Sequence, residues 1–270
     1  MVRADYHLHT YHSMDGMQTF FELCEAALAA NLQEICVTEH LEIGHPDPEM
    51  DKPPVQAAFR EDLEKARASY PQLTIRMGME IGDHPAHRPE IRRWLDAWPL
   101  DFRLLSLHLI HDVDPYDPRY YDAYPDQQHA YRAYLEARLE SIQAWDPADY
   151  DAIAHLGYVA KFAPYPPAAR PLRWEMAPDH LEAMLRIVAQ NGKALEINTS
   201  GYPRIGEPIP GRQLLEHFRA LGGEFVMISS DAHRAASVGA YQEEARALAR
   251  ACGFRYTLLF KDRKPTPITI

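Results

Sequence analysis

The segment DYHLHTYHSMDG, residues 5–16, brings three histidines and two aspartates together near the start of the chain. His7 and His9 are two positions apart at the carboxyl end of a predicted strand over residues 2–8. Successive side chains of a strand alternate between its two faces, so both imidazoles project from the same face. Because imidazole is the commonest protein ligand of transition metals, this spacing suits either a metal site or a solvated polar terminus, and the other strand ends distinguish the two.

Outward from this segment, short apolar runs alternate with longer amphipathic stretches, which is typical of βα units around a parallel sheet. Strands are predicted at VRADYHL (2–8), EICVTE (34–39), LTIRMGME (73–80), DFRLLSL (101–107), DAIAHL (151–156), KALEINT (193–199) and EFVMISS (224–230). Helices are predicted over residues 17–32, 58–70, 87–98, 128–145, 176–192, 211–223 and 237–253. Seven strands, each followed by a helix, favour a single α/β barrel domain over residues 1–270. The insert HDVDPYDPRYYDAYPDQ (111–127) is predicted as a loop long enough to cover a site.

The composition limits the classes of partner. The net charge is -11 and no basic stripe accompanies it, which argues against a nucleic-acid partner. Cys24, Cys36 and Cys252 lie far apart without a CxxC pair, which is typical of buried thiols in a reducing compartment. No apolar run approaches the ~18 residues that span a bilayer. We therefore expect a soluble cytoplasmic protein with no membrane partner, and the sequence leaves its oligomeric state open.

Six of the seven predicted strands end in a histidine, aspartate or glutamate, in the motifs HLH, TEH, GME, SLH, AHLG and SSDAH. A barrel of this class gathers its active site at these strand ends. With one aspartate added from the opening segment, the candidate metal ligands are His7, His9, Asp15, His40, Glu80, His108, His155, Asp231 and His233. These exceed the ligands of one tetrahedral zinc, and a carboxylate such as Glu80 can bridge two ions, so we expect two or three divalent metals. Imidazole and carboxylate ligands suit Zn, Fe, Mn or Co, and the sequence does not choose among them.

Such a cluster favours a phosphate ester as the substrate. Three divalent ions would outweigh the carboxylates of Asp15, Glu80 and Asp231, and the resulting positive pocket suits a phosphate monoester dianion. A bound metal lowers the pKa of its water to about 7, which makes hydroxide available at neutral pH to attack phosphorus.

The motifs DYHLHTYHSMDG, VTEH, GME, SLH, AHLG and SSDAH, in this order, resemble those of the polymerase and histidinol phosphatase (PHP) superfamily of metallohydrolases. Within it, the segments DAIAHLGYVAKF and ALEINTSGY, the chain length and the insert after His108 are similar to the histidinol-phosphate phosphatase branch. The resemblance implies a distorted seven-stranded (β/α)7 TIM-like barrel with a trinuclear metal site. It also implies hydrolysis of L-histidinol phosphate to L-histidinol and phosphate, a step of histidine biosynthesis.

The resemblance further implies a role for each ligand. One metal would be held by His7, His9, Glu80 and Asp231, a second by Glu80, His108 and His155, and a third by Asp15, His40 and His233. A bridging hydroxide would be the nucleophile, with Asp231 and His233 as the candidates for proton transfer. The predicted substrate contacts are Lys161 and Arg204 to the phosphate, His12 at the pocket, and Glu42 and Asp112 to the ammonium and imidazole of histidinol. Asn198 and Ser200 are predicted to hydrogen-bond to the ligands from outside.

Three alternatives stay open. An amidohydrolase-type enzyme also begins with HxH on its first strand, but it has eight strands and often a bridging lysine, whereas here Glu80 is the predicted bridge. A PHP-type phosphoesterase acting on a nucleotide or another small phosphate monoester is closer. The third alternative is a metal-binding module without catalytic activity.

Overall fold

A computed structural model describes residues 2–270, and its strands form one nine-stranded sheet in their order along the chain. The strands are β1 Ala4–Asp5, β2 Glu34–Leu41, β3 Thr74–Gly82, β4 Phe102–Ser106, β5 Ala152–Ile153, β6 Ala194–Asn198, β7 Phe225–Ser229, β8 Tyr256–Lys261 and β9 Lys264–Thr269. Neighbouring strands from β1 to β8 pair in parallel, and β9 returns antiparallel to β8. The α/β class and the parallel order of the seven predicted strands are confirmed.

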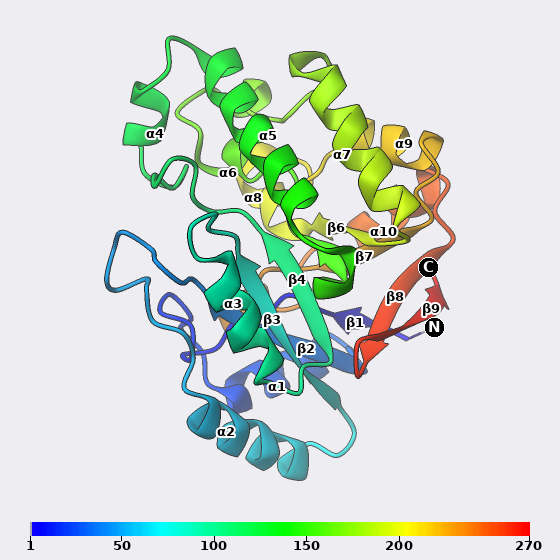
Figure 1. Cartoon of the computed structure of the whole chain (residues 1–270). Helices are drawn as coiled ribbons and strands as arrows, with labels where there is room; N and C mark the ends of the chain where they lie inside the picture. The colour runs from blue at the N-terminus through cyan, green and yellow to red at the C-terminus, as the bar shows by residue number, and fades with distance from the viewer. Residues whose placement is uncertain (1) are drawn as a thin grey trace.

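Helices connect these strands and cover the sheet, with α2 at the bottom of the view and α5 and α7 at the top (Figure 1). They are α1 Phe20–Ala29, α2 Gln56–Ser69, α3 Arg88–Asp96, α4 Arg119–Asp122, α5 Gln127–Ala144, α6 Val159–Phe162, α7 Pro178–Gln190, α8 Tyr202–Ile205, α9 Arg212–Ala220 and α10 Gln242–Ala251. The first shows how the local sequence acts: Thr19 and Glu22 form a capping box that begins α1. The apolar residues of α1 recur at helical spacing, and this face, which includes Leu23 and Ala27, is buried in the hydrophobic core.

The sheet curves until its first and seventh strands meet. Leu8, just past β1, forms a parallel bridge with Ala232, just past β7, and His9 N–H donates to the Ala232 carbonyl at 3.0 Å. The buried Asp5 carboxylate accepts from the main-chain N–H of Ser230 at 2.9 Å. These contacts join β1 to β7 by single hydrogen bonds rather than by a continuous ladder, so the barrel is distorted.

The β8–β9 hairpin lies beside this seam, at the right edge of the view (Figure 1). The N–H of Phe260 donates to the Tyr6 hydroxyl at 2.9 Å, and the rings of Phe260, Tyr6 and Phe102 all contact one another. The strands β8 and β9 are not among the predicted strands. Of the two, β9 contains Pro265 and Pro267, residues that disfavour a strand.

Two features make this hairpin compatible with its sequence. Asp262 and Arg263 have φ of 49° and 60°, as the central residues of a two-residue hairpin turn require. Ile270 N–H donates to the Arg255 carbonyl, which sets the pairing of the two strands. The main-chain N–H groups of the even-numbered residues of β9 therefore point toward β8, and the nitrogens of the prolines point to the free edge.

The predicted loop 111–127 contains the short helix α4, whose Tyr120 and Tyr121 are buried. Tyr121 donates its hydroxyl to the Val159 carbonyl at 2.6 Å, so this insert packs on the start of α6 as a wall. Within residues 2–270, none of the helices has the length and apolar character needed to cross a bilayer.

Candidate metal centre

The carboxyl ends of the parallel strands bring the predicted ligands together. His40 on β2 and Glu80 on β3 are neighbours in the strand register, so their side chains emerge side by side. His108 lies two residues beyond β4, and His155 lies two residues beyond β5. Asp231 follows β7 in the same way and has a φ of 55°, a backbone conformation that is uncommon for a non-glycine residue and concentrates at functional sites.

Glu80 is fully buried at the middle of the cluster. Its Oε1 lies 2.9 Å from His155 Nε2 and 3.2 Å from His108 Nε2. Its Oε2 lies 3.0 Å from His7 Nε2 and 3.0 Å from His40 Nδ1. Because each oxygen faces a different group of imidazoles, this carboxylate is placed to bridge two ions.

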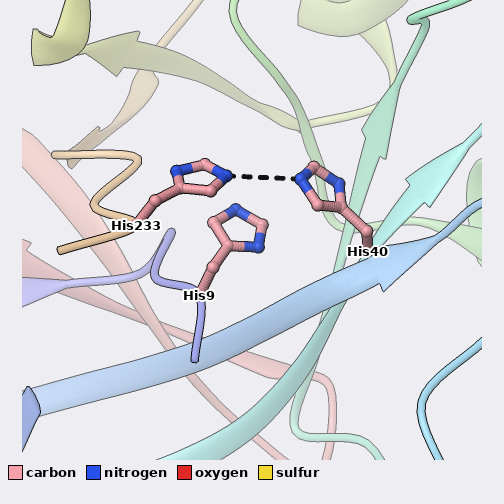
Figure 2. Close-up of side chains that lie close together, drawn as sticks. All are labelled: His9, His40 and His233. Atoms are coloured by element: carbon pink, nitrogen blue, oxygen red, sulfur yellow. Dashed lines mark hydrogen bonds between the residues drawn. The ribbon is translucent and has the colours of Figure 1, made fainter. Parts of the chain in front are cut away.

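A second part of the cluster contains three imidazoles that point toward one another, with the His9 ring between those of His40 and His233 (Figure 2). The His9 ring stacks on both of the others at centroid distances of 4.2 Å, and the Nε2 atoms of His40 and His233 are 3.4 Å apart. Asp15 approaches from the rim, with Oδ2 3.1 Å from His233 Nε2 and Oδ1 3.5 Å from His40 Nε2. Three imidazoles and one carboxylate thus converge on one position.

Asp231 lies between the imidazoles of the cluster and Lys161. Its Oδ1 lies 3.6 Å from the Nε2 atoms of both His7 and His9. Burial opposes ionisation of this carboxyl, but Lys161 and His7 hold its pKa well below the usual range. Asp231 therefore remains a carboxylate that is available to a cation.

The other oxygen of Asp231 is held by protein donors. Oδ2 accepts from Lys161 Nζ at 2.7 Å, from Ser200 Oγ at 3.2 Å and from Asn198 Nδ2 at 3.3 Å. Asn198 and Ser200 thus hydrogen-bond to Asp231, which is a predicted ligand. These bonds fix the carboxylate so that Oδ1 faces the imidazoles.

The donor set fits metal ions on two observations. Buried polar atoms without a hydrogen-bond partner in residues 2–270 include His7 Nε2, His9 Nε2, His40 Nδ1 and Glu80 Oε2, and a cation between them would satisfy all of these acceptors. Four sets of three residues have ligand atoms within 4.8 Å of one another. They are His9, His40 and His233; His7, Glu80 and His155; His7, His9 and Asp231; and His40, Glu80 and His108. All the predicted ligands except Asp15 occur in these sets, and their division among separate ions stays a prediction.

Protonation in the metal-free chain differs among the candidate ligands. Burial disfavours the charged form of His40, but Glu80 and Asp15 raise its pKa to about 9, so this imidazole would lose a proton on binding a metal. Burial disfavours the charged form of Glu80, but the imidazoles of His7 and His40 hold its pKa well below the usual range. Burial lowers the pKa of His9 well below its ordinary value, and the neighbouring His233 and His40 lower it further. Glu80 is therefore ionised and His9 neutral, which are the forms that bind metals.

Behind the imidazoles stand buried acceptors that orient them. Glu196 on β6 accepts from His7 Nδ1 at 2.6 Å. Ser13 Oγ lies 3.2 Å from His9 Nδ1 and donates to the buried Glu39. Such partners hold the ring of a ligating histidine and raise its basicity. The sequence reasoning missed Glu196, although a charged residue inside the apolar strand ALEIN was a usable signal.

Glu42 differs from its expected position. The sequence places it at the mouth of the pocket, whereas the structure buries it and brings its Oε1 within 2.7 Å of His108 Nδ1. A Cβ at Gly82 would lie 2.0 Å from the Glu42 carboxylate, so the glycine after Glu80 makes room for this contact. Glu42 is therefore placed to orient His108, a candidate ligand.

His12 also differs from expectation. Its Nε2 lies 3.1 Å from Asp62 on α2, and its ring meets Phe20 and Phe59 edge-on. These contacts direct it between α1 and α2 instead of into the cluster. Asp112 is exposed and lies 3.4 Å from His84, outside the cluster.

Lys161 and Arg204 are brought together at the edge of the cluster. Lys161 Nζ lies 5.6 Å and the Arg204 guanidinium 4.7 Å from the centre of the Phe162 ring. Lys161 also contacts Asp231, so this pair of cations borders the ligands directly.

A hollow of about 600 Å³ opens elsewhere, at the amino ends of β3 and β4. Two of the cations that line it are engaged in structural contacts: Arg67 donates to the Ile75 carbonyl, and Arg76 pairs with Glu34. In barrels this end serves stability, so the strand ends that carry the histidines are the functional face.

The fold and the cluster together define an α/β barrel of the metallohydrolase type. The PHP domain family model matches residues 5–200. A histidinol-phosphatase of Lactococcus lactis subsp. lactis (strain IL1403) is 30% identical over 265 residues, which cover 98% of this chain and 96% of the relative. The crystal structure of histidinol phosphate phosphatase from Lactococcus lactis subsp. lactis Il1403, complexed with zinc, L-histidinol and phosphate, has a TM-score of 0.86 at 29% identity and 98% coverage of both chains. The chain belongs to the PHP family, in the histidinol-phosphatase branch that its motifs predict.

Proposed function

We propose that residues 1–270 form a single metal-dependent phosphatase domain that hydrolyses L-histidinol phosphate to L-histidinol and phosphate. The observation that carries this proposal is the buried Glu80 carboxylate, whose two oxygens face separate groups of imidazoles. The solved relative with bound zinc, L-histidinol and phosphate supports the substrate. We expect the enzyme to act in the cytoplasm on this small molecule, without a nucleic-acid partner.

The ligands would hold two or three divalent ions, with zinc as the first choice and iron or manganese as alternatives. Their proposed division is that of the sequence analysis, with Glu80 shared between two ions. When bound, such ions polarise the phosphoryl oxygens and lower the pKa of a coordinated water, so that a hydroxide nucleophile exists at neutral pH.

Asp231 and His233 are the proposed catalytic residues. His233 Nδ1 donates to the Asp231 carbonyl at 2.9 Å, which leaves Nε2 as the basic nitrogen facing the cluster. The carboxylate of Asp231 borders both the imidazoles and Lys161. From there Asp231 and His233 orient the attacking water and accept its proton, and the ester bond breaks as the alcohol oxygen takes up a proton.

Lys161 and Arg204 would bind the phosphate. Both are cations beside Phe162, and Lys161 reaches the cluster through Asp231. A phosphate monoester carries two negative charges, so charge-assisted bonds from these side chains would hold it in line with the nucleophile.

The cationic part of histidinol would meet Asp114 rather than Glu42, His12 or Asp112. Tyr158 packs against the rings of His108 and His155, both at 5.2 Å, and donates its hydroxyl to Asp114 Oδ1 at 3.1 Å. Asp114 thus lies one tyrosine side chain away from the candidate ligands, a separation suited to a substrate with phosphate at one end and amine and imidazole at the other. Burial raises the pKa of its carboxyl, and a cationic partner would favour the ionised form.

One assay tests the proposal. The purified chain is stripped of metal, reloaded with zinc or manganese, and offered histidinol phosphate, mononucleotides, phenyl phosphate and an acyl amide. We expect phosphate release to depend on metal and to have its highest kcat/KM with histidinol phosphate. A higher kcat/KM with a mononucleotide would indicate the alternative phosphoesterase, and amide cleavage would indicate the amidohydrolase class. Metal binding without turnover of any compound would indicate a non-catalytic module.

A further inference from the structure

Arg138 is an unusual residue for the outer helix α5, because its side chain is fully buried. Its Nη2 donates to the carbonyl of Leu105 on β4 at 2.7 Å and to the carbonyl of Ala154, just past β5, at 3.1 Å. A buried guanidinium is costly unless negative groups surround it, and carbonyl oxygens supply only part of that compensation. Its partners are therefore informative.

The second carbonyl belongs to the peptide that joins Ala154 to His155. On the opposite side of the same peptide, His155 N–H donates to Glu196 Oε2 at 2.5 Å. Glu196 is also fully buried. A single peptide unit is thus held between a buried cation on its oxygen and a buried anion on its nitrogen, and its dipole is aligned with both charges.

This peptide controls the direction of a candidate ligand. His155 has a φ of 21°, a positive value that a non-glycine residue keeps only where surrounding contacts enforce it. Its Nε2 lies 2.9 Å from Glu80 Oε1. A rotation of the Ala154–His155 peptide would swing the imidazole away from Glu80.

The same clamp reaches a second imidazole. Glu196 Oε1 accepts from His7 Nδ1 at 2.6 Å and from Ser229 Oγ at 2.5 Å, so one carboxylate orients both His7 and the His155 peptide. Arg138 stabilises the charge of Glu196 through the intervening peptide.

We infer that Arg138 is a positioning residue of the metal centre: with Glu196 it clamps the Ala154–His155 peptide and thereby sets the geometry of the Glu80–His155 ligand pair. The inference rests on the metal site proposed above and not on the identity of the substrate. A purely structural reading assigns Arg138 only the task of tying α5 to β4 and β5. If Arg138 is only structural, its replacement leaves the metal affinity of the folded chain unchanged. If it positions the ligand pair, its replacement lowers that affinity.

The test compares Arg138→Met, which keeps much of the volume, with Arg138→Lys, which keeps the charge and one donor. Arg132→Met is the matched control, since Arg132 lies on the same helix, is exposed and pairs only with the exposed Glu136 among the contacts of α5 described here. Each metal-free protein is titrated with Zn²⁺ against a chromophoric chelator, and its Co²⁺ complex is recorded by visible absorption. Thermal unfolding of the metal-free forms is measured separately.

We expect Arg138→Met to weaken one zinc equivalent by about 10–100-fold and to change the Co²⁺ spectrum, as loss of a residue that orients a ligand does. Arg138→Lys should recover part of the affinity, and Arg132→Met should match the parent. Unchanged zinc affinity and an unchanged Co²⁺ spectrum in Arg138→Met would overturn the inference, even with a lower melting temperature. If Arg138→Met does not fold, the zinc affinity and the Co²⁺ spectrum of Arg138→Lys are compared with those of the parent, and unchanged values would overturn the inference. A parent chain that takes up no zinc would instead refute the proposed metal site.

Discussion

Replacing Glu80 with glutamine removes the carboxylate that faces both halves of the cluster while keeping its size. On the Oε1 side, His108 and His155 would remain as two imidazoles, fewer than the three protein ligands of a catalytic zinc site. We therefore expect Glu80→Gln to lose at least about one metal ion per chain.

Loss of one ion that polarises the phosphate removes several kcal/mol of transition-state stabilisation. A loss of about 4 kcal/mol corresponds to a roughly thousandfold fall in kcat/KM, which is the effect we expect. The assay is metal content per chain by elemental analysis, together with phosphate release from histidinol phosphate. Glu182→Gln, at an exposed carboxylate on α7 that pairs with Arg186, is the control. A Glu80→Gln protein with full metal content and kcat/KM within twofold of the parent would show that Glu80 bridges no ions.

Three further predictions concern single side chains. Lys161→Ala should raise KM roughly 10–100-fold, the change expected from losing one charge-assisted hydrogen bond to the phosphate, and should retain its metal content. Loss of metal would show that the main role of Lys161 is to hold Asp231. Asp114→Asn should raise KM for histidinol phosphate and leave phenyl phosphate unaffected, because only the former carries an amine; equal effects on both substrates would contradict the assignment. Phe260→Ala removes a buried ring that contacts both Tyr6 and Phe102, so it should lower the free energy of unfolding in urea by about 3–5 kcal/mol. An unchanged urea midpoint would mean that the hairpin is not part of the core.

The ligand set could be predicted from the sequence because it depends on a simple property of parallel sheets. The carboxyl ends of all strands lie at one end of a barrel, so a histidine or carboxylate that ends a strand is brought to the others without knowledge of any contact. His40 and Glu80 illustrate this, since they are neighbours in register. The rule needs only the strand pattern, which the apolar runs supply.

The groups behind the ligands could not be predicted in this way. Glu196 meets His7 across 189 residues, and Glu42 meets His108 across 66, so the burial of each carboxylate depends on a partner that local pattern does not identify. Arg138 has the position of an ordinary charged residue in an amphipathic helix, and only the packing of α5 on β4 and β5 shows that it is buried. The prolines of β9 likewise depend on tertiary structure, since they are acceptable in a strand only because their nitrogens face the open edge.

The seam that joins the beginning of the barrel to its seventh strand has a consequence for synthesis. Asp5 cannot form its hydrogen bond to Ser230 until a further 225 residues have been synthesised. The imidazole of His40 cannot meet that of His233 until a further 193 residues have been added. At about 5–20 residues per second, a ribosome needs roughly 10–45 seconds to supply the missing partners. During that interval the first histidines leave the ribosome without a pocket to enclose them. Metal uptake by the complete cluster would therefore come only after β7 and His233 have been synthesised.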